Sequence, residues 1–183
     1  VMMGILGTMP LFGVLLIKDQ VEALFSNVIF VSCALLATGF LLFFSDRVAR
    51  GRKTAKTATV SDALLVGCAQ AVAVVPGLSR SGTTISAGMM RGFDRRFAVR
   101  FSFLLSLPAV LGANILELKD AMSAGFDTTL LPVYFVGMAV SMVVGYFAIH
   151  LVNPLAAKGK FGKFAYYCWA VGAISLIAGL ILK

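Results

Sequence analysis

Residues 76–84 read Pro-Gly-Leu-Ser-Arg-Ser-Gly-Thr-Thr and interrupt an apolar stretch that runs over Ala63–Met90. Arg80 is the single charged residue between Asp62 and Arg91. An arginine at membrane depth costs about 2.5–3.5 kcal/mol on insertion scales, so it persists only beside a partner or a water-filled cavity. The stretch has two readings: one long tilted helix, or two half-helices that enter the membrane and return on the same side.

The composition is that of a membrane protein. Of the 183 residues, 60% are hydrophobic and only 13% are charged, whereas soluble domains carry about 25% charged residues. The net charge of +8 comes from Lys and Arg in short loops between apolar runs, which favours membrane loops over a nucleic-acid-binding surface. The three cysteines lie far apart in apolar stretches and do not have the spacing of a metal site.

The apolar runs predict an all-α, polytopic membrane helix bundle with about five full spans plus one re-entrant helix pair. A span needs about 20 predominantly apolar residues. We treat residues 1–183 as a single integral membrane domain. The expected spans are Met2–Ile17, Val28–Phe44, Phe97–Leu116, Pro132–Val152 and Phe164–Leu182.

Loop charge favours re-entry of the central segment. Lys and Arg outnumber Asp and Glu in loops 45–60, 91–100 and 153–163, whereas acids dominate loops 18–27 and 117–131. Basic loops collect on the cytoplasmic side. If residues 63–90 crossed fully, one strongly basic loop would lie outside; if they re-enter, all the loops obey the rule.

The tip of this re-entrant segment suits an anionic ligand. Either Ser79 or Ser81 is a good N-cap for the second half-helix. The first N–H groups of a helix lack intrahelical partners and bind phosphate readily, and Arg80 adds a bidentate donor. If Ser81 is the cap, Thr84 is placed to donate its hydroxyl to the same anion, and Gly82 leaves room for a ligand near the backbone. The remaining candidate binding residues are Gly77, Thr83 and Gln70, the last of which an interhelical hydrogen bond would explain equally well.

The motif of residues 76–84 resembles the Pro-Gly-x-Ser-Arg-Ser-x-x-Thr motif of the undecaprenyl-diphosphate phosphatase family, also called bacitracin-resistance proteins. Gly67-Cys68-Ala69-Gln70 before it and Phe101-Ser102-Phe103-Leu104-Leu105-Ser106-Leu107-Pro108 after it are similar to the family pattern. The resemblance extends over the whole chain, as the C-terminal two-thirds of the family. It implies two inverted repeats: residues 1–44 would end the first, 45–60 would form a cytoplasmic loop, and 61–183 would form the second, with 62–92 re-entrant.

The resemblance also implies an activity. Such enzymes hydrolyse an isoprenyl diphosphate in the bacterial cytoplasmic membrane, recycle the lipid carrier of cell-wall synthesis, and confer bacitracin resistance. Ser79, Arg80 and Thr84 match active-site residues that open to the periplasm. The family's N-terminal glutamate motif has no match here, so a divalent cation such as Mg or Ca would be held by a part that this chain lacks, and the chain alone would be inactive.

Two other functions fit the same residues. A transporter of an anion or lipid phosphate also uses broken helices whose N-termini point at a midplane anion. A non-catalytic membrane scaffold would tolerate loss of Arg80. The sequence shows no metal-ligand cluster and leaves the nucleophile and the oligomeric state open.

Overall fold

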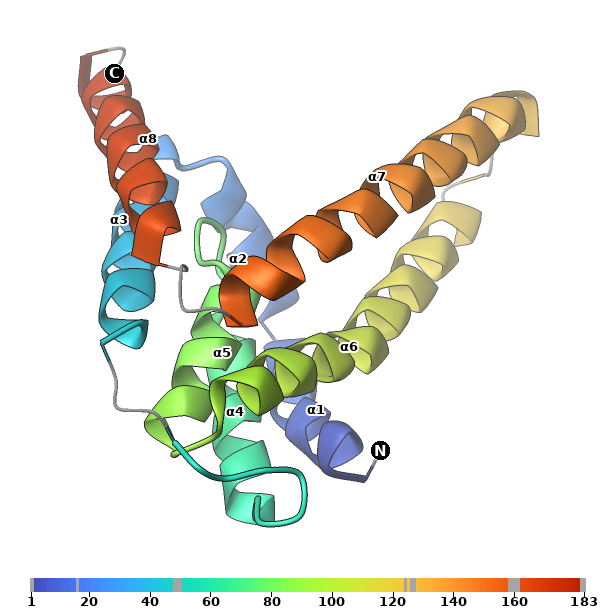
Figure 1. Ribbon diagram of the computed structural model, residues 1–183. Coiled ribbons are helices and arrows are strands. Elements are labelled where there is room, and N and C mark those ends of the chain that lie inside the picture. Colours follow the sequence, from blue (N-terminus) through green and yellow to red (C-terminus); the bar gives the residue numbers. More distant parts are fainter. Residues whose placement is uncertain are drawn as a thin grey trace.

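The computed structural model describes residues 2–15, 17–47, 51–123, 125, 128–157 and 162–181 (Figure 1). These residues confirm the all-α class, because the extended pairing among them is limited to one isolated bridge between Lys53 and Phe93. The elements are α1 (Met2–Leu15), α2 (Lys18–Phe25), α3 (Val28–Ser45), α4 (Val60–Val72), α5 (Arg80–Met90), α6 (Arg95–Ser123), η1 (Thr128–Leu130), α7 (Leu131–Ala157) and α8 (Gly162–Ile181).

Four of the described helices are long and apolar enough to cross a membrane. They are α3, α6, α7 and α8, which correspond to four of the five predicted spans. The first predicted span forms α1, whose 14 residues fall short of the length of about 20 that a crossing requires. The chain is therefore a multi-pass membrane protein, and among the described residues α1 is the one predicted span that forms a shorter helix.

The central apolar segment folds back on itself. Helix α4 ends at Val72 and α5 begins at Arg80. At the far end of this pair, Arg91, the residue after α5, donates from Nε to Oδ1 of Asp62 in the first turn of α4 over 2.8 Å. The segment therefore ends where it begins, as the re-entrant reading predicts. The division of the chain into two repeats stays a prediction.

The loops on either side of this hairpin are hydrogen-bonded to each other. Lys53 donates its backbone N–H to the carbonyl oxygen of Gly92 (2.9 Å), and Asp94 donates its own to the carbonyl oxygen of Lys53 (2.8 Å). Since Lys53 and Gly92 belong to the two basic loops that flank the segment, these loops lie on one side of the bundle. A segment that crossed the membrane fully would separate them.

A third basic loop reaches the same place. One carboxylate oxygen of Asp46, just after α3, accepts from Nη1 of Arg95. The other accepts from the backbone N–H of Gly162 at the start of α8. The ends of all three basic loops are thus gathered at one end of the molecule, opposite the tip of the α4–α5 hairpin.

Asp62 links the two basic loops at this end of the molecule, because it pairs with both Lys53 and Arg91. Its carboxylate also accepts from Lys53 Nζ (2.8 Å) and from the backbone N–H of Thr59 (3.1 Å), which forms a capping box with it. The side chain is fully buried in the first turn of α4, outside the four candidate spans. Burial raises the pKa of Asp62, but the hydrogen bonds from Lys53, Thr59 and Arg91 outweigh it and hold this pKa well below its usual range.

Replacing Asp62 with asparagine is expected to destabilise the protein by about 2 kcal/mol, because two charge-assisted bonds are lost from a buried site while Lys53 and Arg91 keep partial access to water. The lowered pKa means that the wild-type contribution is complete above about pH 4 and declines as pH falls below it. Chemical unfolding of the two proteins in micelles between pH 3 and pH 7 measures both effects. Equal stabilities at pH 7 would contradict this role.

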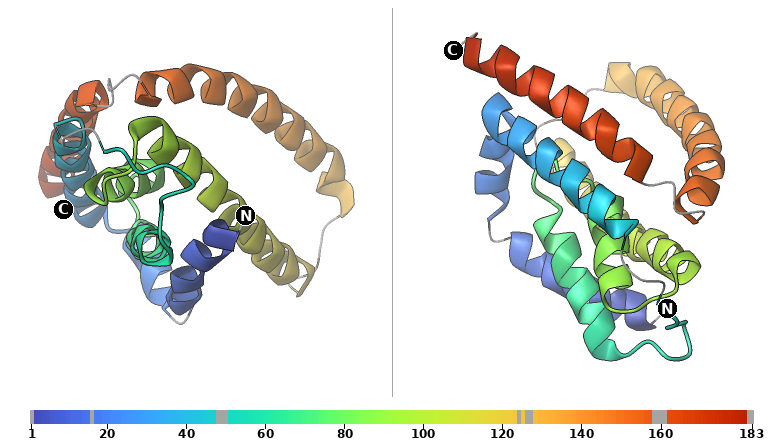
Figure 2. Two further views of the ribbon diagram at one scale, coloured as in Figure 1. Left: turned by 60° about the horizontal axis from the view of Figure 1, so that its bottom comes forward. Right: turned by 60° about the vertical axis from the view of Figure 1, so that its left-hand side comes forward.

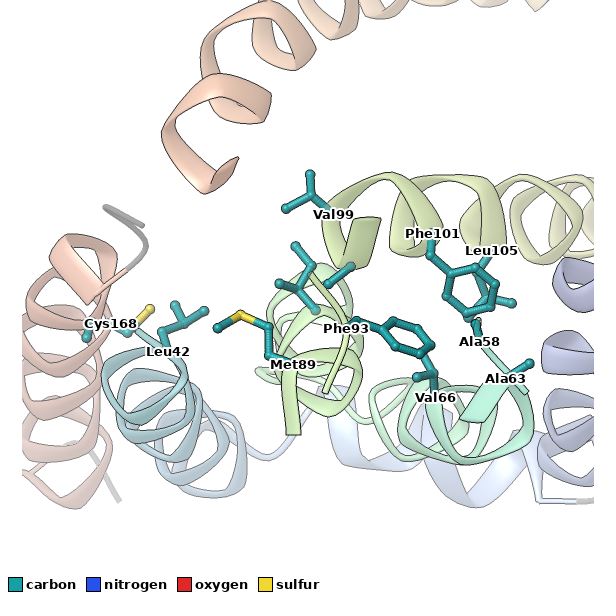
Figure 3. Packing of buried hydrophobic residues seen from close by; sticks show 13 residues of the cluster. Leu42, Ala58, Ala63, Val66, Met89, Phe93, Val99, Phe101, Leu105 and Cys168 are labelled. Carbon is teal, nitrogen blue, oxygen red and sulfur yellow. The ribbon is translucent and has the colours of Figure 1, made fainter. Parts of the chain in front are cut away.

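The core lies between the hairpin and α6. Phe93, in the turn after α5, packs with Val66 of α4 and with Phe101 and Leu105 of α6 (Figure 3). On the other side of the hairpin, Leu42 of α3 points toward Met89 of α5 (Figure 3). Helices α3 and α8 lie side by side along most of their length (Figure 2).

Helix α1 crosses α4 at two glycines. A Cβ added at Gly67 would lie 2.1 Å from the carbonyl oxygen of Gly7, so the two backbones are in direct contact, as small residues allow in membranes. By contrast, none of the residues in the apolar window of α7 is buried, and α7 projects from the bundle beside the end of α6 (Figure 1).

Candidate functional site

Ser79 is the N-cap of α5. Its backbone is extended (φ −70°, ψ 109°) and its Oγ accepts from the backbone N–H of Gly82 over 3.2 Å. The helix therefore begins at Arg80, which decides between the two caps that the sequence allows. Gly82 makes room for this cap: a Cβ there would lie 2.8 Å from a methyl group of Leu42 and 3.0 Å from Ser79 Oγ. The space beside Gly82 is thus filled by Leu42 and Ser79, and not left for a ligand as the sequence predicted.

The cap leaves two backbone donors free at the tip. Ser79 Oγ satisfies Gly82, and the N–H of Thr83 donates to the carbonyl oxygen of Ser79 (2.8 Å). Among the described residues, no acceptor meets the N–H groups of Arg80 and Ser81. These two groups carry the positive end of the helix dipole and are free to bind an anion.

Arg80 is the first residue of α5, and its side chain has no ion-pair partner among the described residues. It is exposed, and no carboxylate of the described ranges forms an ion pair with it. Its helix ends at the cluster of basic loops, which contains the carboxylates of Asp46, Asp62 and Asp94. The guanidinium is therefore separated from those acids by the length of α5 and is available to a ligand.

Thr84 has partners inside the protein. Its side chain is 1% exposed, and its hydroxyl lies 2.9 Å from the carbonyl oxygen of Arg80, to which it donates, and 3.2 Å from that of Ser81. The hydroxyl of Ser102 in α6 is 2.5 Å away. With Ser79 as the cap, Thr84 faces α6, and the structure does not bring its hydroxyl to the N–H groups at the tip.

The Thr84–Ser102 pair is expected to link the anion-binding end of α5 to α6. A double-mutant cycle with Thr84→Val and Ser102→Ala should give a coupling free energy of about 1 kcal/mol, because each single change leaves one buried hydroxyl without its partner. Unfolding free energies of the four proteins provide the measurement. Additive effects would show that the hydroxyls act independently.

The other predicted binding residues differ in their positions. Gly77 lies in the turn before α5 and has a φ of +91°, a left-handed conformation that favours glycine. Thr83 is buried in the first turn of α5. Gln70 is 1% exposed, yet neither its amide nitrogen nor its oxygen has a partner in the described part of the chain. The interhelical bond that the sequence allows for Gln70 is therefore not formed there, and its role in binding stays a prediction.

Two side chains that the sequence did not single out contact the motif. Thr38 of α3 bonds to the turn before α5, and Ser102 of α6 bonds to Thr84. Ser102 lies in the segment of family resemblance, which is a signal for it. Thr38 has no such signal, because its partners lie 39 and 41 residues further along the chain.

The described acids do not fit a cation at this tip. The structure places no group of three Asp, Glu, His or Cys side chains together within the described ranges. Asp46 and Asp62 are bonded to arginine, lysine and backbone donors at the basic end. Asp94 caps the start of α6 by accepting from the N–H groups of Arg96 and Phe97.

Comparison with known proteins gives a match over nearly the whole chain. Residues 1–174 match the family model described as bacitracin resistance protein BacA. The chain is 46% identical to the undecaprenyl-diphosphatase of Methanothermobacter thermautotrophicus over 185 aligned residues, which cover 98% of this chain and 100% of that protein.

Longer relatives match as well. The chain is 43% identical to the undecaprenyl-diphosphatase of Halothermothrix orenii, over 98% of this chain and 69% of that protein. It is 42% identical to that of Desulforapulum autotrophicum, over 97% of this chain and 64% of that protein. Relatives of this chain therefore differ in length, and the end-to-end match to one of them speaks against the expectation that a chain of this length would be inactive.

Proposed function

The chain belongs to the family of the bacitracin resistance protein BacA, and we propose that it hydrolyses undecaprenyl diphosphate to undecaprenyl phosphate and inorganic phosphate. Relatives with the name undecaprenyl-diphosphatase, 42–46% identical over nearly the whole chain, support this activity. The observation that carries the chemistry is the N-terminus of α5, where two N–H groups and the guanidinium of the first helical residue have no partner among the described residues.

The tip of the hairpin recognises the diphosphate through charge and hydrogen bonds. The N–H groups of Arg80 and Ser81 donate to oxygens of the terminal phosphate, and the Arg80 guanidinium donates to oxygens on either side of the bridging position. Ser79 keeps the helix end in place by capping Gly82. The lipid chain lies in the bilayer alongside the apolar helices.

These donors also serve the reaction. Hydrolysis adds water to the terminal phosphorus and breaks its bond to the bridging oxygen, which leaves with the lipid monophosphate. Negative charge spreads over the transferring oxygens and the leaving oxygen as that bond breaks. Fixed N–H groups and a guanidinium stabilise this charge more strongly than that of the bound diphosphate, which lowers the barrier. Thr84 contributes by fixing α5 against α6.

A divalent cation stays a proposal. Such an ion neutralises phosphate charge when it is bound, but the described acids at the basic end are bonded elsewhere and do not supply its ligands at the tip. Binding of the diphosphate and stabilisation of the developing charge are therefore assigned to the N–H groups and the guanidinium of this chain.

The basic end sets the orientation that we propose. The described ends of three loops rich in Lys and Arg gather there, and such loops remain on the cytoplasmic side. The tip with Arg80 then faces the opposite side, which is the periplasm if the protein lies in the cytoplasmic membrane of a bacterium. Recycling of a cell-wall lipid carrier on the outer face agrees with this placement.

Phosphate release by the purified protein in detergent micelles tests the proposal. With undecaprenyl diphosphate as the substrate, we expect one phosphate for each lipid and accumulation of the monophosphate. Undecaprenyl phosphate, which has no anhydride bond, should release none. A folded protein that releases no phosphate from the diphosphate would overturn the proposal, and uptake of phosphate into proteoliposomes by that protein would instead support the transporter alternative.

A further inference from the structure

Thr38 of α3 holds both sides of the turn that precedes α5. Its hydroxyl donates to the carbonyl oxygen of Gly77 over 2.9 Å and accepts from the backbone N–H of Ser79 over 3.1 Å. The side chain is 2% exposed. One hydroxyl thus satisfies an acceptor and a donor on either side of Leu78, from a helix that lies about 40 residues earlier in the chain.

Neither the carbonyl oxygen of Gly77 nor the N–H of Ser79 has another partner among the residues that the structure describes. A buried peptide group without a hydrogen bond is unfavourable, and more so within a bilayer. The turn would therefore rearrange if the Thr38 hydroxyl were removed. Because Ser79 is the residue whose N–H is held, any rearrangement begins at the N-cap of the anion-binding helix.

The same face of α3 also supports the turn sterically. A Cβ added at Gly77 would lie 2.5 Å from the carbonyl oxygen of Val31 and 2.8 Å from Cβ of Ala34. Residues 31, 34 and 38 share one face of a helix, since they are three and four residues apart. The left-handed turn at Gly77 is thus seated directly on α3, and Thr38 closes the contact.

We propose that Thr38 is a positioning residue for the phosphate-binding end of α5. It fixes the Ser79 backbone so that the Ser79 side chain caps Gly82 and the N–H groups of Arg80 and Ser81 point toward the ligand. Thr38 does not touch the ligand, because both its donor and its acceptor roles are taken by the turn. The inference rests on the proposed function, since it concerns the same site.

The chain offers a matched control on the same helix. Ser32 is 1% exposed, and its hydroxyl donates to the carbonyl oxygen of Val28 within α3, so its hydrogen bond is local to that helix. Ser32→Ala removes a buried hydroxyl as Thr38→Val does, without affecting the hairpin. Thr38→Ser keeps the hydroxyl and removes only the methyl group.

The experiment compares kcat, KM and thermal unfolding for wild type, Thr38→Val, Thr38→Ser and Ser32→Ala with undecaprenyl diphosphate in micelles. We expect Thr38→Val to lower kcat by about 10- to 100-fold with a smaller change in KM, because misplaced donors harm the transition state most. Thr38→Ser should retain kcat within about threefold of wild type, and Ser32→Ala should match wild type. A Thr38→Val enzyme with wild-type kcat, or a Thr38→Ser enzyme as slow as Thr38→Val, would overturn the proposal.

Two further measurements keep the test decisive. If Thr38→Val does not fold, Thr38→Cys replaces it, because a thiol is a weak donor and acceptor. The kcat of Thr38→Cys should be lower than that of Thr38→Ser but still measurable. If wild type releases no phosphate, the proposed function fails, and calorimetric titration with inorganic pyrophosphate tests Thr38 alone. Binding that is lost in the Thr38 variant and kept in Ser32→Ala supports its positioning role; equal binding contradicts it.

Discussion

Arg80→Ala is expected to lower phosphate release from undecaprenyl diphosphate by at least about a thousandfold, because arginines that stabilise a transferring phosphoryl group contribute factors of that order to kcat. The side chain is exposed and forms no ion pair within the described ranges. Its loss should therefore leave the unfolding temperature almost unchanged. Phosphate release and thermal unfolding, measured on the same preparation, check both parts.

Two controls test whether activity depends on a positive charge at position 80 and on the geometry of its donors. Arg100→Ala removes an exposed arginine from α6, in the basic region away from the tip, and should retain full activity. Arg80→Lys keeps the charge without the two-pronged donor geometry and should fall between wild type and Arg80→Ala. Activity of Arg80→Ala close to that of wild type would remove the central element of the proposed chemistry.

Gly67→Ala is expected to destabilise the protein strongly. The added Cβ would lie 2.1 Å from the carbonyl oxygen of Gly7, 2.8 Å from its carbonyl carbon and 3.0 Å from its Cα. All three atoms belong to backbone, so no side-chain rotation relieves the contact and α1 must move away from α4. Overpacking costs about 1–3 kcal/mol or more, which we expect to appear as a clear fall in the unfolding temperature.

Gly112→Ala is the matched control. Gly112 is also within a helix, but a Cβ there meets no atom within 4 Å. This change should be neutral or stabilise the protein by up to about 1 kcal/mol, because alanine favours helix over glycine. If both variants unfold at the same temperature, the close crossing of α1 and α4 does not limit stability.

The re-entrant hairpin was predictable because it depends on charge as well as hydropathy. Residues 63–90 are apolar on both sides of the motif, so hydropathy alone does not show whether the segment crosses the membrane or returns to the same side. The excess of Lys and Arg in both adjoining loops favours the return, and the hydrogen bond between Lys53 and Gly92 brings these two loops together as a return requires. The length of α1 was less predictable, since the apolar run at 2–17 continues past the residue at which the helix ends.

At the tip, the sequence predicted the kind of site but not the roles of all its hydroxyls. Ser79 and Ser81 are equally good caps by residue type, and the choice depends on the turn at Gly77. With Ser79 as the cap, Thr84 lies two positions further into α5 than a Ser81 cap would place it, and it bonds to Ser102. Thr38 was not predictable, because a threonine in an apolar span shows nothing of its partners until α3 and the turn are brought together.

The length of the hairpin places its tip at a particular depth in the bilayer. The 13 residues of α4 extend about 20 Å, whereas the hydrocarbon layer is about 30 Å thick. A diphosphate that reaches Arg80 from the far side must therefore descend roughly 10 Å below the level of its neighbouring headgroups. Compounds designed for this site need a charged group that follows the same path, with a tail short or flexible enough to bend back toward the surface.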